Sequence, residues 1–274
     1  MSSEHPKKAL ITGATIGVGR EVAAGLAAAG FELIIHGRSP DRLRDAKAWF
    51  HERYPQTHVE TVRADLQVLS EVRAAARELS SRHSHIDVLM LNAEVVSRDP
   101  HLTVDGWETT FAVNHLAHFA LTQGLLPLLR ATPNAPGRVI ITSNAAHARG
   151  HFDPARCRSI DNFDAYRSFA DSKLANLLFM AELQRREPTL SVTAVHPGHL
   201  PVKLLTNTFG AEGGDTIMGR STTAVWLARS PEAARLRGAY CVDQHATHPS
   251  TAAQDPSLAK ALWELSEEAL VSVR

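Results

Sequence analysis

Short apolar runs alternate with longer helix-like segments along almost the whole chain, and this alternation restricts the fold more than any other feature. The runs lack strict alternation of apolar and polar residues, which is typical of parallel-sheet strands covered on both faces. The expected strands are 9–12, 32–36, 59–62, 86–91, 139–142, 191–195 and 240–242, and the expected helices are 20–29, 41–53, 69–82, 106–129 and 168–186. Repeated βαβ units with right-handed crossovers predict an α/β, doubly wound, Rossmann-like parallel sheet with helices on both faces.

The length and the unbroken pattern predict one domain over residues 1–274, because no linker, low-complexity tract or repeat interrupts it. A polar leader, 1–7, comes before the first strand. The stretch 199–220 contains Gly210, Gly213, Gly214 and Gly219 and has no clear period, so we expect a substrate loop or flap there. Ligands of such sheets bind beyond the carboxyl ends of the strands.

The charge composition argues against partners that are held by net charge. Lys and Arg number 29 and Asp and Glu number 29, a formal net charge of zero, whereas nucleic acid or anionic lipid needs clustered cations. No stretch approaches the roughly 20 apolar residues of a membrane span, and the N-terminus lacks the apolar segment of a signal peptide. Cys157 and Cys241 cannot build a disulfide framework, so we expect a cytoplasmic protein.

A glycine-rich turn follows the first expected strand and opens the first helix. Its glycines are Gly13, Gly17 and Gly19, with Thr15 and Val18 between them. Glycine lets the backbone approach a phosphate closely, and the amides and dipole of a helix N-terminus attract the anion. The G-x-x-x-G-x-G spacing differs from the usual G-x-G-x-x-G, but its position predicts a site for the pyrophosphate of a dinucleotide.

Residues at the ends of the next strands indicate which dinucleotide binds. Arg38 comes just after the second strand, where the adenosine ribose is expected, and no acidic residue stands there. An arginine at this point accommodates the 2′-phosphate of NADP, whereas an acid favours NAD. Asp65 and Leu66 follow the third strand, and Asn92 and Ala93 follow the fourth. We therefore expect NADP(H) as the cofactor, rather than NAD(H).

Six motifs occur in a fixed order along the chain, and a seventh lies near its end. They are the turn 12–19, the pair 65–66, the segment 113–119, the strand 138–143, the helix 172–179, the turn 196–198 and the segment 262–267. Together they resemble the short-chain dehydrogenase/reductase (SDR) family, and in particular its retinol-dehydrogenase-like branch. The resemblance covers nearly the whole chain.

The resemblance implies an oxidoreductase with a named role for each site residue. It implies that Asn114 holds a water relay, that Ser143 polarises the substrate oxygen, and that Lys173 binds the nicotinamide ribose and lowers the pKa of a catalytic tyrosine. It places Pro197 and Gly198 on the nicotinamide side of the cofactor. Hydride transfer to a carbonyl leaves charge on oxygen, so an acid and a hydrogen-bond donor are needed there.

The sequence departs from the family pattern at three positions. The place of the catalytic tyrosine, four residues before Lys173, holds Phe169. Phenylalanine has no hydroxyl and cannot supply general acid catalysis, which contributes roughly 10²- to 10⁴-fold. Glu94 stands where the family has a glycine, and Val202 stands where it has a hydroxyl residue that contacts the nicotinamide amide.

Three explanations of these departures stay open. In the first, a redox enzyme uses another acid, and Tyr166 is the nearest candidate because it shares a helix face with Phe169 if the helix extends that far. In the second, the fold catalyses an isomerisation, cyclisation or dehydration, with Ser143, Glu94 or a pocket histidine moving the proton. In the third, Phe169 is an engineered change. A catalytically dead binding protein is a further alternative.

We predict an NADP(H)-dependent oxidoreductase with an atypical active site, acting on a carbonyl or alcohol of a small lipophilic or polyketide-like molecule. Histidines form close pairs such as His115 and His118, but no H-E-x-x-H or Cys/His cluster accompanies them, so no metal is expected. We expect a small-molecule substrate and no nucleic-acid partner. The resemblance implies a homo-oligomer formed through the helices near 107–129 and 168–186.

Overall fold

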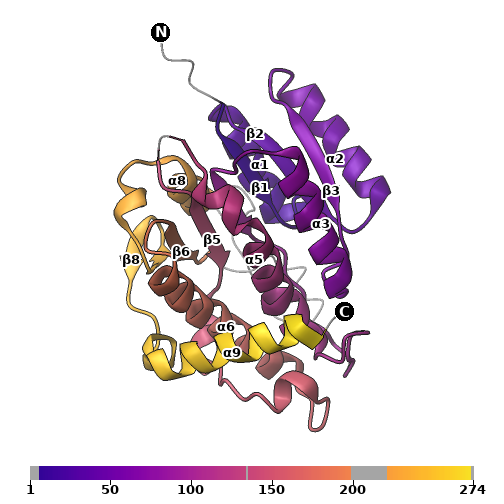
Figure 1. Ribbon diagram of the computed structural model, residues 1–274, viewed down its shortest axis with the longest axis vertical. Helices are drawn as coiled ribbons and strands as arrows, with labels where there is room; N and C mark the ends of the chain where they lie inside the picture. Colours follow the sequence, from indigo (N-terminus) through magenta and orange to yellow (C-terminus); the bar gives the residue numbers. More distant parts are fainter. Residues whose placement is uncertain (1–5, 134, 199–220, 273–274) are drawn as a thin grey trace.

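The computed structural model describes residues 6–133, 135–198 and 221–272, and in this part the chain forms one sheet with helices on both faces (Figure 1). The strands are β1 Lys8–Ile11, β2 Glu32–Gly37, β3 Val59–Arg63, β4 Val88–Leu91, β5 Arg138–Thr142, β6 Ser191–Val195, β7 Ala239–Val242 and β8 His245–Thr247. The helices are α1 Gly17–Ala28, α2 Pro40–Arg53, α3 Leu69–Arg82, α4 Thr109–Phe111, α5 Ala117–Arg130, α6 Ala165–Arg186, α8 Thr222–Arg229 and α9 Pro256–Ser272. Short 3₁₀ or π segments are η1 Ala112–Leu116, η2 Ala145–Arg149, η3 Arg156–Arg158, η4 Ala233–Arg235 and η5 Thr251–Gln254.

The strand order confirms the doubly wound fold. The sheet runs β3-β2-β1-β4-β5-β6-β7-β8, and every pair is parallel except β7 with β8. From β1 the chain builds outward to β3, and then returns to β4 and builds toward the other edge. The direction therefore reverses between β1 and β4, and ligands of such sheets bind at the carboxyl ends of the strands beside this reversal.

Two apolar layers enclose the sheet, because its strands present buried side chains to both faces. On one face, α3, α5 and α6 pack against residues such as Leu89. On the other face, α1, α2 and α8 pack against residues such as Ile35. Helix α9, yellow in Figure 1, lies against α6. Both faces are thus covered, which explains why the strands read as continuous apolar runs.

The expected helix 106–129 is the main difference from the sequence-based elements. It is built from α4, the π-helical turn η1 and α5. A π turn holds one more residue than an α turn and re-aims the side chains on it, and periodicity alone does not reveal such an insertion. The short antiparallel strand β8 was also not predicted, since its three residues are all exposed.

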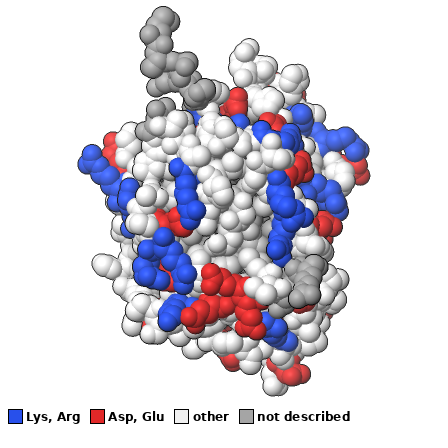
Figure 2. All heavy atoms as spheres, viewed as in Figure 1, with Lys and Arg blue, Asp and Glu red and all other residues white. Residues whose placement is uncertain are grey.

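The drawn face of the molecule carries charges of both signs. Figure 2 shows basic and acidic side chains beside one another on the face drawn, rather than one extended basic area. None of the described helices combines the length and apolar character that a membrane span requires. The expected loop 199–220, with Val202, and residues 1–5 of the leader lie outside the described ranges.

Candidate active site

The turn between β1 and α1 depends on glycine at three positions. Gly13 and Gly17 have φ values of 66° and 62°, in the left-handed region that glycine adopts without strain. A Cβ on Gly19 would lie 2.4 Å from the carbonyl oxygen of Gly13 and 2.5 Å from Nδ2 of Asn92. Ile16, before α1, gives the helix no side-chain cap, so its first amides are available to an anion.

A cavity of about 380 Å³ opens beside this turn, at the carboxyl ends of the central strands. All but two of the predicted cofactor residues line it, namely Gly13, Thr15, Gly17, Val18, Gly19, Arg38, Asp65, Leu66, Asn92, Ala93 and Pro197. The other two, Lys173 and Gly198, are not among its lining residues. The volume lies in the range of small-molecule sites.

His36 is a lining residue that the sequence analysis missed. Its Nδ1 accepts a hydrogen bond from the Gly13 amide at 3.3 Å, and its Nε2 donates to the Ala64 carbonyl at 3.1 Å. Burial lowers the pKa of His36 to about 4, so the ring is neutral near pH 7. A histidine at the end of an otherwise apolar strand was the available signal. The His36 side chain connects the glycine turn to the residue that follows β3.

Two arginines lie at the β2 end of the cavity. Arg38 and Arg42 both line it, and both are exposed residues. Arg42 lies on the first turn of α2, where Ser39 caps the helix by accepting from the Arg42 amide at 3.4 Å. Sequence analysis found Arg38 and missed Arg42, although the two are four residues apart. The pair gives this end of the cleft a positive charge.

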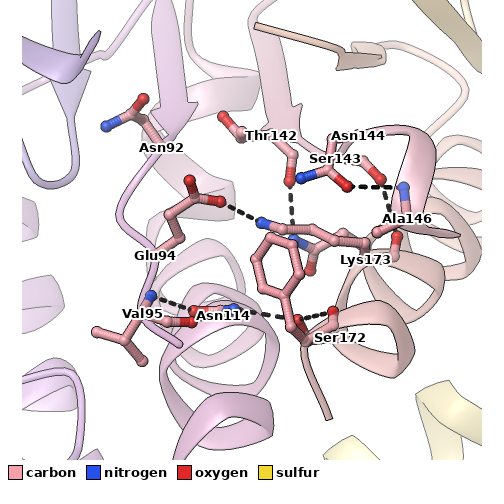
Figure 3. A network of polar contacts seen from close by, with 12 residues as sticks. Asn92, Glu94, Val95, Asn114, Thr142, Ser143, Asn144, Ala146, Ser172 and Lys173 are labelled. Carbon is pink, nitrogen blue, oxygen red and sulfur yellow. Dashed lines mark hydrogen bonds and ion pairs between the residues drawn. The ribbon is translucent and has the colours of Figure 1, made fainter. Parts of the chain in front are cut away.

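Asn114 is completely buried and lies on the π turn η1. Its Oδ1 accepts from the Val95 amide at 2.8 Å, and its Nδ2 donates to the Val95 carbonyl and to the Ser172 hydroxyl, both at 3.0 Å (Figure 3). The side chain therefore fastens the segment after β4 to α6. Asn114 does not line the cavity, although its partner Val95 does, and both ends of its amide are used in these contacts.

Lys173 does not meet a hydroxyl at this site; its partner is a carboxylate. Its Nζ lies 2.5 Å from Oε2 of Glu94 and 5.1 Å from the centroid of the Phe169 ring. The Lys173 side chain is 1% exposed and that of Glu94 is 17% exposed. Glu94 lines the cavity and Lys173 does not, so the carboxylate stands between the ammonium and whatever enters.

The hydroxyl of Ser143 is turned away from this pair. It donates to the backbone carbonyl of Lys173 at 2.9 Å, and the residue is fully buried. The next residue, Asn144, faces the other way. Its Oδ1 accepts from the Ala146 amide at 3.0 Å, while its buried Nδ2 has no hydrogen-bond partner within the described residues. A buried donor left unpaired costs about 1–3 kcal/mol.

Tyr166 is not brought to the Lys173 ammonium. It lies on the first turn of α6, seven residues before Lys173, which is about 10 Å along the helix axis. It is not among the residues that line the cavity. Its role as the replacement acid stays a prediction.

Gly198 has a φ of 83° and its amide donates to Nδ1 of His196 at 3.0 Å, which orients the turn after β6.

In the part of the chain that the structure describes, no group of three or more His, Cys, Asp or Glu side chains is placed to hold a metal ion. His115 and His118 are both buried, and burial lowers both pKa values to about 3. His115 bonds to the Ser266 hydroxyl at 2.9 Å. These histidines belong to the packing of the helices around the site.

Comparison with known proteins agrees with this geometry. A family model described as short chain dehydrogenase matches residues 7–212. The chain is 33% identical to a protein named "Putative daunorubicin C-13 ketoreductase" from Streptomyces sp. strain C5, over 95% of this chain and 91% of that protein. It is 33% identical to human retinol dehydrogenase 14, over 96% of this chain and 86% of that protein.

Solved structures share the architecture. The crystal structure of an uncharacterized protein from Mycobacterium paratuberculosis is 31% identical, with a TM-score of 0.76, over 97% of this chain and 96% of that chain. A short chain dehydrogenase from Escherichia coli CFT073, solved with NADPH, is 24% identical, with a TM-score of 0.71, over 85% of this chain and 95% of that chain. The second likeness concerns the fold alone.

Proposed function

Because the chain belongs to the short chain dehydrogenase family, whose members are oxidoreductases with nicotinamide cofactors, we propose that it binds NADP(H) and acts on a carbonyl or alcohol group of a small lipophilic or polyketide-like molecule. Its reaction centre is atypical, since Phe169 stands at the place of the catalytic tyrosine. The cofactor lies in the cavity beside the glycine turn. Arg38 and Arg42 would hold its adenosine half, and Glu94 and Pro197 would lie beside its nicotinamide half.

The observation that carries the choice of cofactor is the pair of arginines at the β2 end. Arg38 and Arg42 line the same end of the cavity, and no acidic residue directly follows β2. A guanidinium binds a phosphate through charge-assisted hydrogen bonds, whereas a carboxylate at this position accepts from the ribose 2′-hydroxyl of NAD. This arrangement favours a 2′-phosphate, which NADP carries and NAD lacks.

The names of the relatives support the substrate class. One is named for the reduction of the C-13 ketone of daunorubicin, an aromatic polyketide, and another for retinol, a lipophilic alcohol. Both substrates carry the reacting oxygen on a large apolar skeleton. The lining of the cavity includes the apolar side chains of Val95, Val113 and Pro197, which suit such a skeleton.

A single-turnover assay tests the redox reaction. The protein, loaded with one equivalent of NADPH, is mixed with daunorubicin or all-trans-retinal, and the nicotinamide absorbance is followed for wild type and Phe169→Tyr. We expect slow oxidation of NADPH by the wild type and a rate roughly 10²- to 10⁴-fold higher for Phe169→Tyr. Tyr166→Phe is the control for the alternative acid. If this variant oxidises NADPH at the wild-type rate, Tyr166 is not the acid.

Non-redox chemistry is the second candidate, and the ion pair between Lys173 and Glu94 favours it. A carboxylate that lines the cavity can move protons without a hydride. NADPH that binds but is never oxidised by the wild type would support this candidate. A chain that binds neither NADPH nor any carbonyl compound would instead be the binding protein with a dead site.

A further inference from the structure

A polar residue follows the carboxyl end of each of two neighbouring strands, Glu94 after β4 and Asn144 after β5. In the parallel register Leu91 pairs with Ile141, and Glu94 and Asn144 each follow three residues later. Both residues lie beyond the last paired residues of these strands, in the segments that leave the sheet at its carboxyl edge. Figure 3 shows the Asn144 amide nitrogen on the side of the Lys173 ammonium and Glu94, pointing away from Ala146.

The orientation of the Asn144 amide is determined by its other end. Oδ1 accepts from the Ala146 amide at 3.0 Å, and a flipped amide would place two donors against each other. Nδ2 therefore points away from Ala146, toward the side of Lys173 and Glu94 (Figure 3), where it is buried and has no partner within the described residues. The residue is 4% exposed. This is a fixed hydrogen-bond donor that lacks an acceptor.

The Glu94 carboxylate supplies the opposite function. One oxygen is held by the Lys173 ammonium at 2.5 Å, which fixes the side chain. The carboxylate lines the cavity, and the ammonium behind it is 1% exposed. A molecule in the cleft thus meets a positioned carboxylate, which can accept a proton.

Neighbouring hydroxyls are already committed to protein acceptors. The Ser143 hydroxyl donates to the Lys173 carbonyl, and the Ser172 hydroxyl donates to the Phe169 carbonyl at 2.7 Å. The remaining one, on Thr142, has no partner within the described residues and lines the cavity. It is a second polar atom that awaits a ligand, but it is a weak base. Proton removal therefore falls to Glu94.

We propose that this site catalyses proton transfer at the carbon next to a carbonyl, the interconversion of keto and enol forms, in addition to the redox reaction. Glu94 takes the α proton as the C–H bond breaks, and the electron pair moves to the carbonyl oxygen, which accepts from Nδ2 of Asn144. The proton returns from Glu94 to carbon or oxygen, so the step is balanced without hydride or any co-reactant. Lys173 acts as a positioning residue for Glu94.

The substrate class is an aryl-fused ketone with acidic α protons. A carboxylate base and an amide donor on one face of a carbonyl are the two groups that enolisation requires. The enol form also complements the pair, since its hydroxyl donates to Glu94 and its oxygen accepts from Asn144. The proposal rests on the proposed function only for this choice of carbonyl compounds as substrates.

Deuterium exchange tests the proposal. The bicyclic ketone 2-tetralone is incubated with the full-length protein in D₂O, with and without NADP⁺, and loss of its α protons is followed by NMR. We expect wild type to accelerate exchange over buffer. Glu94→Gln is expected to lower the protein-dependent rate by at least about 100-fold, and Glu94→Asp is expected to restore part of it.

The second variant isolates the donor. Asn144→Asp keeps the oxygen that accepts from Ala146 and replaces the amide donor with an acceptor, so the fold is retained while the donor is lost. We expect a rate lower by about 10²- to 10³-fold. Because residue 144 is buried, the new carboxylate also lowers the melting temperature, so the rates are compared at a temperature where both proteins are fully folded. Glu78→Gln removes a carboxylate from a surface ion pair with Arg82 on α3 and is expected to exchange like wild type.

Two results would overturn the proposal: a wild-type rate equal to that of buffer, or a rate that Glu94→Gln leaves unchanged. Binding of adenosine 2′,5′-bisphosphate is measured on the same samples. This ligand fills only the adenosine half of the cleft, so its failure to bind would contradict the NADP proposal and leave the exchange result standing. Exchange that fails while this ligand binds would contradict the enolisation proposal alone.

Discussion

The hydroxyl of Thr12 lies 3.0 Å from Nε2 of His118, although 106 positions separate the two residues. His118 donates from Nδ1 to the Asn114 carbonyl at 3.1 Å, so Nε2 is the acceptor and Thr12 donates to it. The Thr12 oxygen in turn accepts from the backbone amides of Asn92 and Ala93 at 2.8 and 3.0 Å. A neutral His118 thus joins the first strand, the end of β4 and the π turn that carries Asn114.

The buried histidines predict a loss of stability in acid. Burial lowers the pKa of His36 to about 4 and the pKa values of His115 and His118 to about 3. Unfolded histidines take up protons near pH 6.5, so between pH 6.5 and 4 the unfolded state binds more protons. The free energy of unfolding therefore falls as the pH drops through this window, by up to about 1.4 kcal/mol per pH unit for each histidine.

Urea unfolding at pH 7, 6 and 5 measures this dependence. His118→Asn is the informative variant, because asparagine can keep a hydrogen bond at this position and does not titrate. We expect its stability to fall less steeply with acid than that of wild type, by about one proton. Equal slopes for the two proteins would show that His118 does not remain neutral in the folded state.

Gly19→Ala is expected to weaken cofactor binding as well as the fold. The new Cβ would meet the Gly13 carbonyl oxygen at 2.4 Å, so the phosphate turn has to shift, at a cost of about 1–3 kcal/mol in stability. Gly124→Ala is the control, since its Cβ would lie 2.6 Å from the Ala76 Cβ, between α5 and α3 and away from the cleft. NADPH fluorescence titration should show weaker binding for Gly19→Ala only.

Arg42→Ala is expected to reduce NADPH affinity about tenfold and to leave NADH affinity unchanged, because one charge-assisted hydrogen bond to the 2′-phosphate is lost. Arg44→Ala removes a neighbouring arginine of the same helix. Arg44 is paired with Asp41 at 2.6 Å and does not line the cavity. Equal losses in the two variants would indicate a general charge effect rather than a phosphate contact.

Asn114→Asp is expected to destabilise the protein by about 2–4 kcal/mol, because the carboxylate cannot donate to the Val95 carbonyl or to the Ser172 hydroxyl. The same change frees the segment that carries Glu94, so catalytic rates should fall beyond the loss explained by unfolding. Urea unfolding and single-turnover kinetics on one preparation separate the two effects. A variant as stable as wild type would contradict the buried three-bond arrangement.

The fold could be predicted from the sequence because the patterns that define its strands and helices are local. The bounds of α3 and β6 agree with the sequence analysis, because apolar runs and helix-length segments are local features. The π turn η1 was not predicted, since hydrophobic periodicity does not reveal a one-residue insertion in a helix. Strand β8 is exposed and too short to carry a period.

The residues that line the cavity were predicted more completely than the contacts around Lys173. Glycines and strand-end residues follow rules of position, and nearly all of them line one cavity. The reaction centre depends on pairings between distant residues. Lys173 and Glu94 are 79 positions apart. The sequence did not indicate that they pair, that the Ser143 hydroxyl binds the Lys173 carbonyl, or that Nδ2 of Asn144 has no partner among the described residues.

Titration of the wild type with NADPH and NADH, followed by nicotinamide fluorescence, tests the central proposal most directly. With Arg38 and Arg42 at the adenosine end, we expect NADPH to bind at least about tenfold more tightly than NADH, and the difference to shrink in Arg38→Ala. Binding of neither cofactor, or equal binding of both, would contradict an NADP(H) site in this cleft.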